Sequence, residues 1–214
     1  MHDVGIAKHF EQVYQIVSHP RFLARKGLGN EVPFFVDVYK PENEFAVKGQ
    51  IHTLYQRLQS NGIETVALPM YEIVLEVLKN AGRLQSLFDW EPKAPKTGAR
   101  RTFLSEMEKF TDPAGGKRLQ QEILSRLEAA PGHKLVLMYE LGTIFPFLRT
   151  HTLLNNLHAV ITEVPLVAFF PGKYVSSDRE GFYLSLFGKF NGDYYRAFQL
   201  QDYIERGKIR ADVE

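Results

Sequence analysis

Residues 134–172 read KLVLMYELGTIFPFLRTHTLLNNLHAVITEVPLVAFFPG, and this stretch decides the fold class. Two apolar runs flank a turn and an amphipathic run. Parallel strands that are buried on both faces are continuously hydrophobic, and a helix usually connects them. The stretch therefore predicts a βαβ unit.

Polar residues gather in the connection of this unit. In open α/β sheets, ligands or partners bind near the C-terminal ends of the strands. The candidate interaction residues from this region are Glu140, Arg149, His151, Asn155 and Asn156, with His158 close by.

Further elements extend the pattern along the chain. Apolar runs at 32–39 and 63–68 predict two more strands, and helices are expected before Ser18, after Pro41 and after Pro69. The helix after Pro41 is expected to turn Phe45, Ile51, Leu54, Tyr55 and Leu58 inward. A linker at 90–101 and two helices, near 102–110 and after Asp112-Pro113, predict a helical insertion over residues 90–130.

The C-terminal part predicts an antiparallel edge hairpin. Its strands are expected at 183–187 and 194–200, joined by Asn191-Gly192, a strong hairpin signal. Together these elements predict one α/β domain over residues 1–214. It is three-layer and Rossmann-like, with a mainly parallel sheet and helices on both faces.

Composition excludes several classes of protein. The chain has 214 residues and no cysteine, so a disulfide scaffold, a thiolate zinc site and a cysteine nucleophile are excluded. A net charge of +1 argues against direct nucleic-acid contact as the main role. The N-terminus has no apolar signal region, and no apolar stretch is long enough to suggest a membrane span. A cytoplasmic protein is expected.

No catalytic or cofactor motif emerges from the sequence. The nearest approach to a P-loop is Gly115-Gly116-Lys117-Arg118, which lacks the leading glycine and the hydroxyl residue. His151 and His158 lie two helical turns apart, too far for both to reach one zinc ion comfortably. Neither a metal nor a cofactor is therefore expected.

Asp37 and Glu140 lie in or after buried strands and could approach one another across adjacent strands. The simpler interpretation is that each caps a helix or pairs with an arginine, because buried charge is tolerated that way. A second candidate surface is the linker, where Trp90 lies near Arg100 and Arg101. An exposed aromatic among arginines is a common interface anchor.

Several blocks together resemble the BrxB family of the BREX bacteriophage-exclusion systems. The blocks are FLARKGLGNEVPFFVDVY (22–39), ALPMYEIVLEVL (67–78), YELGTIFPFLRTHTLLNNLH (139–158), PLVAFFPGKY (165–174), LSLFGKF and YYRAFQL. The resemblance implies a cytoplasmic bacterial antiviral component without catalytic residues. It also implies three partners: a large ATPase (BrxC), an alkaline-phosphatase-like protein (PglZ) and an adenine-specific methyltransferase (PglX).

Two hypotheses of different classes follow. The first is a non-catalytic adaptor that docks on a larger BREX subunit through the 149–158 region or the 90–101 linker. The alternative is a cryptic nucleotide-sensing or metal-dependent enzyme without a P-loop, using Glu140, Asp37 and Arg149. A third, weaker hypothesis is DNA binding through the basic loops.

Overall fold

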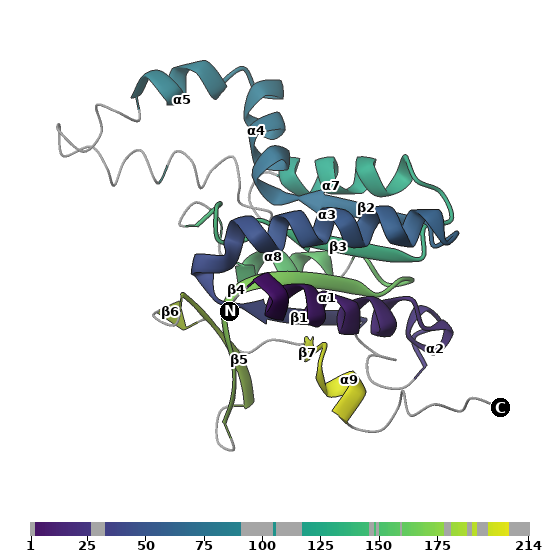
Figure 1. Cartoon of the computed structure of the whole chain (residues 1–214). Coiled ribbons are helices and arrows are strands. Elements are labelled where there is room, and N and C mark those ends of the chain that lie inside the picture. Colours follow the sequence, from purple (N-terminus) through teal and green to yellow (C-terminus); the bar gives the residue numbers. More distant parts are fainter. Residues whose placement is uncertain are drawn as a thin grey trace.

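The structure, a computed structural model, is an α/β fold in which a mainly parallel sheet is covered by helices (Figure 1). It describes residues 3–26, 33–90, 105, 117–145, 148, 150–158, 160–177, 181–187, 190–191 and 197–205. The helices are α1 (Asp3–Val17), α2 (Pro20–Leu23), α3 (Glu44–Ser60), α4 (Met70–Asn80), α5 (Leu84–Trp90), α7 (Arg118–Glu128), α8 (Thr150–Leu157) and α9 (Asp202–Glu205), with a 3-10 turn, η1 (Pro41–Asn43). The strands are β1 (Phe34–Tyr39), β2 (Thr65–Pro69), β3 (Leu135–Tyr139), β4 (Leu166–Ser177), β5 (Gly181–Leu186), β6 (Phe190–Asn191) and β7 (Phe198–Gln199).

The central sheet has the strand order β2-β3-β4-β1-β7, and all of these neighbours are parallel. The predicted βαβ unit is confirmed: β3, α8 and β4 follow one another, and β3 pairs with β4. The chain runs from β1 through α3 to the far strand β2, and then returns through β3 to β4 beside β1. Because all of these strands are parallel, the C-terminal ends of β1, β2 and β3 lie at one edge of the sheet.

Helices cover both faces of the sheet, which confirms the three-layer prediction. One hydrophobic cluster joins α1 and α3 to the strand residues Phe35, Leu137 and Phe169. The other joins α4, α7 and α8 to the strand residues Val36 and Met138. Neighbouring strand residues therefore point into different layers, which is why the strands carry unbroken apolar runs.

The helix α3 is placed as predicted, but one of its side chains is not. Its buried residues are Val47, Ile51, Leu54 and Leu58, spaced by four, three and four positions on one helical face. Phe45 lies about 200° around the helix from Val47, and its side chain is 91% exposed. The prediction that Phe45 points inward is therefore wrong.

Antiparallel pairing is present, with partners that differ from the prediction. The second half of β4 pairs with β5, from Gly172 opposite Leu186 to Ser177 opposite Gly181, and β5 also pairs with β6. Phe198 and Gln199 do not pair with β5; they form β7, which lies parallel to β1. Gly172 is needed in this bend, because an added Cβ would lie 2.1 Å from the backbone oxygen of Ser185.

Part of the predicted insertion at 90–130 is described. Leu119, Ile123 and Leu127 of α7 are buried in the same core cluster as α4. The predicted helix near 102–110 lies outside the described residues apart from Ser105. None of the described helices has the length and apolarity needed to cross a membrane.

Candidate functional site

Titratable side chains gather at the sheet edge where β1, β2 and β3 end. Glu140 comes directly after β3, Asp37 lies near the end of β1, and Glu44 and Glu72 lie in the first turns of α3 and α4. Glu140 is 5% exposed and has a backbone φ of 64°. A non-glycine residue in this left-handed region is uncommon. The candidate site is this polar edge of the sheet.

An ion pair across two elements holds Glu140. Lys48 of α3 donates a hydrogen bond to Glu140 Oε1, and this bond is the main cause that raises the pKa of Lys48. The Lys48 side chain is 47% exposed, whereas that of Glu140 is 6% exposed. Glu140 Oε2 is buried and has no hydrogen-bond partner among the described residues. Buried polar atoms are nearly always bonded, so this oxygen is an unused acceptor and an exception to the usual pattern.

A second pair lies beside the first. Tyr39, the last residue of β1, donates its hydroxyl to Glu44 Oε2 at 2.7 Å. Burial raises the pKa of Tyr39, and the nearby carboxylates Glu44 and Glu140 raise it further. Burial also raises the pKa of Glu44, to which Glu140 adds repulsion. Tyr39 therefore remains a protonated donor.

A third pair ties α1 to the sheet. His9 Nε2 lies 3.0 and 2.9 Å from the two carboxylate oxygens of Asp37, which is 2% exposed. The hydrogen bond to Asp37 raises the pKa of His9. Strand β4 lies between β1 and β3, so Asp37 and Glu140 do not face each other across adjacent strands. The partners of the two carboxylates are a histidine and a lysine, whereas an arginine or a helix cap was expected.

The structure places the remaining sequence-predicted residues in different regions. Trp90 is the last residue of α5 and packs, half-buried, against the core cluster under α4. Asn156 and His158 lie on and just after α8, where the His158 ring stacks on Phe34 with 4.1 Å between centroids. His151 and Asn155 belong to α8, but their side chains lie outside the described part of the chain. Arg100, Arg101 and Arg149 also lie outside the described residues.

Sequence reasoning missed Lys48, Tyr39, Glu44 and His9. The sequence offered only a weak signal for these four residues. Each is a polar residue in a strand that ends at the C-terminal edge of the sheet or in a helix that packs on the sheet. Across the described ranges, no three His, Asp or Glu side chains converge closely enough to hold a metal ion.

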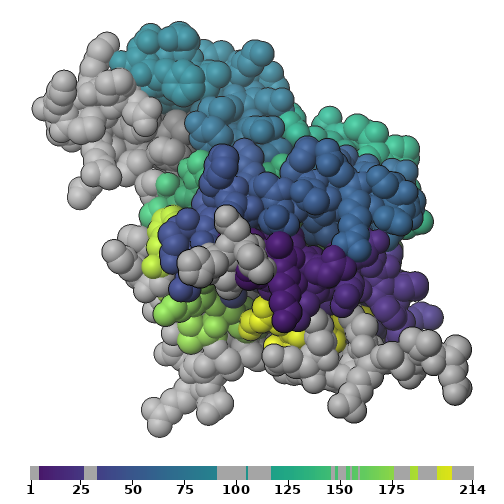
Figure 2. All heavy atoms as spheres, in the orientation of Figure 1, coloured from purple at the N-terminus to yellow at the C-terminus, as the bar shows by residue number. Residues whose placement is uncertain are grey.

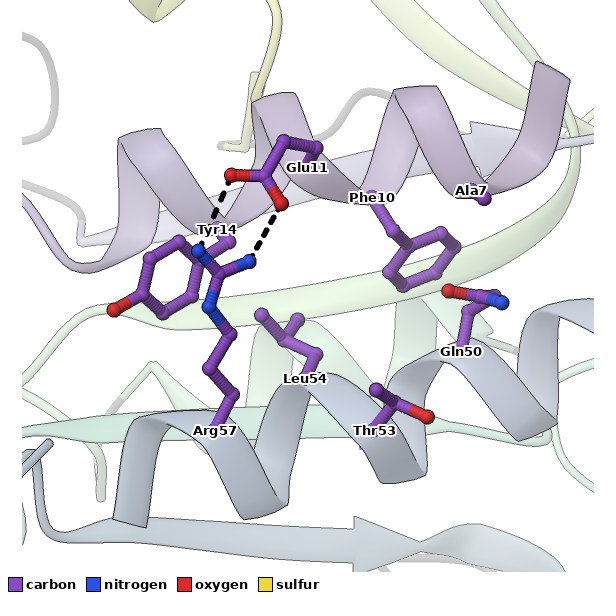
Figure 3. A pocket seen from close by; sticks show the side chains of 8 residues that line it. All are labelled: Ala7, Phe10, Glu11, Tyr14, Gln50, Thr53, Leu54 and Arg57. Carbon is purple, nitrogen blue, oxygen red and sulfur yellow. Dashed lines mark hydrogen bonds and ion pairs between the residues drawn. The ribbon is translucent and has the colours of Figure 1, made fainter. Parts of the chain in front are cut away.

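A shallow groove of about 230 Å³ lies between α1 and α3 (Figure 3). Its floor is apolar, with Phe10 and Leu54. At one end, Arg57 bonds both oxygens of Glu11 at 2.5 and 3.2 Å, and its guanidinium lies 3.5 Å from the centroid of the Tyr14 ring. These contacts already engage the charged groups of the groove, so the polar edge remains the stronger candidate site.

The chain is similar to known proteins along nearly its whole length. The family model described as BREX protein BrxB matches residues 66–200. A BREX protein BrxB from Bacillus cereus (strain H3081.97) is 33% identical over 92% of this chain and 98% of its own length. A BREX protein BrxB from Escherichia coli O9:H4 (strain HS) is 25% identical over 94% of each chain. No solved structure gives a significant match. This chain therefore belongs to the BrxB family of BREX proteins.

Proposed function

We propose that this chain is a non-catalytic adaptor or structural component of a BREX complex, docking onto the larger ATPase or the phosphatase-like subunit. Membership in the BrxB family gives the chain a role in bacteriophage defence. The adaptor role is the more specific step. In this role the chain contributes a surface that binds other subunits and catalyses no reaction of its own.

The pairing of the titratable groups at the sheet edge supports this proposal most. Asp37 is bonded by His9, Glu140 by Lys48 and Glu44 by Tyr39. General acids and bases need a free position within hydrogen-bond reach of a substrate proton. Carboxylates that bind neighbouring helices instead fix those helices on the sheet, which is what a rigid adaptor requires.

Co-purification tests the proposal directly. The tagged chain would be co-expressed with the ATPase, the phosphatase-like protein and the methyltransferase of the same system. We expect at least one of them to be retained in a fixed ratio through affinity and size-exclusion steps. An ATPase from outside the system serves as the control for nonspecific capture. Failure to retain any subunit at micromolar concentration would contradict the adaptor role.

One observation favours the alternative, a nucleotide-sensing or metal-dependent enzyme: within the described part of the chain, Glu140 Oε2 has no hydrogen-bond partner. A ligand at 100 times its Kd would stabilise the fold by about 2.7 kcal/mol, which raises the melting temperature by roughly 5–10 °C for a chain of this size. A thermal-shift screen with nucleotides and divalent cations therefore separates the two proposals. A shift that is present in the natural chain and lost in Glu140→Gln would favour the enzyme.

A further inference from the structure

The outward face of the first half of α3 carries an aromatic ring that the fold does not use. Phe45 is 91% exposed, compared with 48% for Phe88 and 40% for Tyr71, the other exposed large hydrophobic residues of the described ranges. Large aromatic side chains dominate binding energy at protein interfaces. An almost fully exposed ring on a regular helix therefore indicates a contact made outside the chain.

One turn further along the same face lies Gly49. Phe45 and Gly49 are four positions apart, so they are neighbours on the helix surface. A Cβ built on Gly49 would meet nothing within 4 Å, so the fold itself has room for a side chain there. Glycine inside a helix is less favourable than alanine, and its usual benefit is close approach of another backbone. The face thus combines a protruding ring with a smooth patch.

The charge around this face is mainly negative. Glu42 and Glu44 lie where α3 begins. Glu140 is hydrogen-bonded to Lys48, and the charge of Glu72 on α4 also contributes to the raised pKa of Lys48. Of these four carboxylates, Glu42 pairs with Lys40 and Glu140 with Lys48, whereas no lysine or arginine of the described residues pairs with Glu44 or Glu72. One carboxylate oxygen, Glu140 Oε2, receives no hydrogen bond from any residue that the structure describes. The complementary group is a cation with N–H donors, such as a guanidinium.

We propose that this face, made of Glu42, Phe45, Lys48, Gly49 and Glu140, binds a basic helical segment of a partner protein. The partner helix packs its backbone over Gly49 beside the Phe45 ring. One of its arginines reaches the edge of the sheet and joins the Lys48–Glu140 pair, donating to Glu140 Oε2. Figure 2 shows α3 at the surface of the molecule, beside α1. The proposal rests on the adaptor function and names the surface and the chemistry of the partner.

Three substitutions test the surface by titrating the purified partner subunit. Phe45→Ala removes the ring, and Gly49→Gln fills the smooth patch with a good helix former, so the fold is retained while close approach is blocked. Each should weaken binding by at least about tenfold, the size of a typical hot-spot loss. Glu140→Gln should weaken binding and also reduce its dependence on salt, because a charged contact is lost. Phe88→Ala, which removes an exposed phenylalanine from α5, is the matched control and should leave binding unchanged.

The outcomes separate this surface from the adaptor function itself. If the natural chain binds a BREX subunit and both Phe45→Ala and Gly49→Gln bind it within twofold, the surface is wrong and the adaptor role stands. If the natural chain binds none of the subunits, both proposals fall. Light scattering tests whether a second copy of the chain occupies this face. If the isolated chain is a dimer and Phe45→Ala dissociates it, the face binds a second copy, and the proposal of a basic partner helix is wrong.

Discussion

Replacing His9 by leucine should reveal how strongly one buried carboxylate depends on its partner. Asp37 is 2% exposed, and its side-chain bonds in the described structure run to His9 Nε2. Removing one partner of a buried ion pair costs about 3–5 kcal/mol, because the other charge is left buried without compensation. The His9 side chain is 18% exposed, so water screens the pair in part. We expect about 3 kcal/mol, the lower end of the range.

The cost should depend on pH in one direction. The hydrogen bond to Asp37 raises the pKa of His9 above its ordinary value of 6.5. A group whose folded-state pKa is raised adds stability that is complete below the unfolded pKa and is lost as pH rises through the folded one. The effect of His9→Leu should therefore be largest at pH 6 and smallest at pH 9. At pH 9 the neutral imidazole can still donate one hydrogen bond, which is worth about 1 kcal/mol.

Urea denaturation at both pH values measures the free energy of unfolding. Natural and variant chains are compared at the same pH, so that the titration of other groups cancels. Asp37→Asn is the matched control: in that background, His9→Leu should cost less, and its pH dependence should disappear. A cost of His9→Leu that is equal at pH 6 and pH 9, or larger at pH 9, would refute the charged pair.

Four further substitutions test the packing and the edge of the sheet, each measured as a free energy of unfolding. Gly172→Ala places a Cβ 2.1 Å from the Ser185 carbonyl oxygen and should destabilise the fold by about 1–3 kcal/mol. Gly49→Ala places its Cβ in open space and should stabilise the fold by up to about 1 kcal/mol. Changes in the free energy of unfolding with the same sign for both variants would contradict the roles given to these glycines. Lys48→Met leaves Glu140 without its donor and should cost about 1–3 kcal/mol, with recovery of part of the loss when Glu140→Gln is added. Leu137→Ala opens a cavity in a fully buried strand and should cost about 2–5 kcal/mol; a loss below 1 kcal/mol would contradict its central position.

The strands and the crossover were predictable because their signal is local. Residues 134–172 contain two apolar runs, and a parallel strand buried on both faces has that pattern wherever it lies in a sheet. Two helix ends also carry a local signal: Gly62 and Gly82 follow α3 and α4 and have φ values of 72° and 66°, which a glycine adopts without strain. The strand order could not be predicted from local patterns, because it depends on which apolar runs pair with each other in the folded sheet.

The pairs at the candidate site were not predictable from local patterns. His9 and Asp37 are 28 positions apart, and Lys48 and Glu140 are 92 positions apart. Only the crossing of α1 and α3 over the sheet brings these partners together. The wrong pairing predicted for 194–200 came from relying on a local signal. Asn191-Gly192 favoured a hairpin between neighbouring segments, but β4 continues beyond Pro171 and pairs with β5.

The two pairs His9–Asp37 and Lys48–Glu140, each with a buried carboxylate, give the layer formed by α1 and α3 a property that hydrophobic contacts alone do not provide. Apolar packing is non-directional, whereas an ion pair holds two particular atoms together. His9 fixes α1 to β1 and Lys48 fixes α3 to the end of β3, with β4 between the two attachment points. Either helix would leave a carboxylate buried and uncompensated if it moved, which makes such movement costly. A partner that docks on Phe45 and Gly49 therefore meets a helix whose position is already set, and binding to a preorganised surface loses less free energy to ordering.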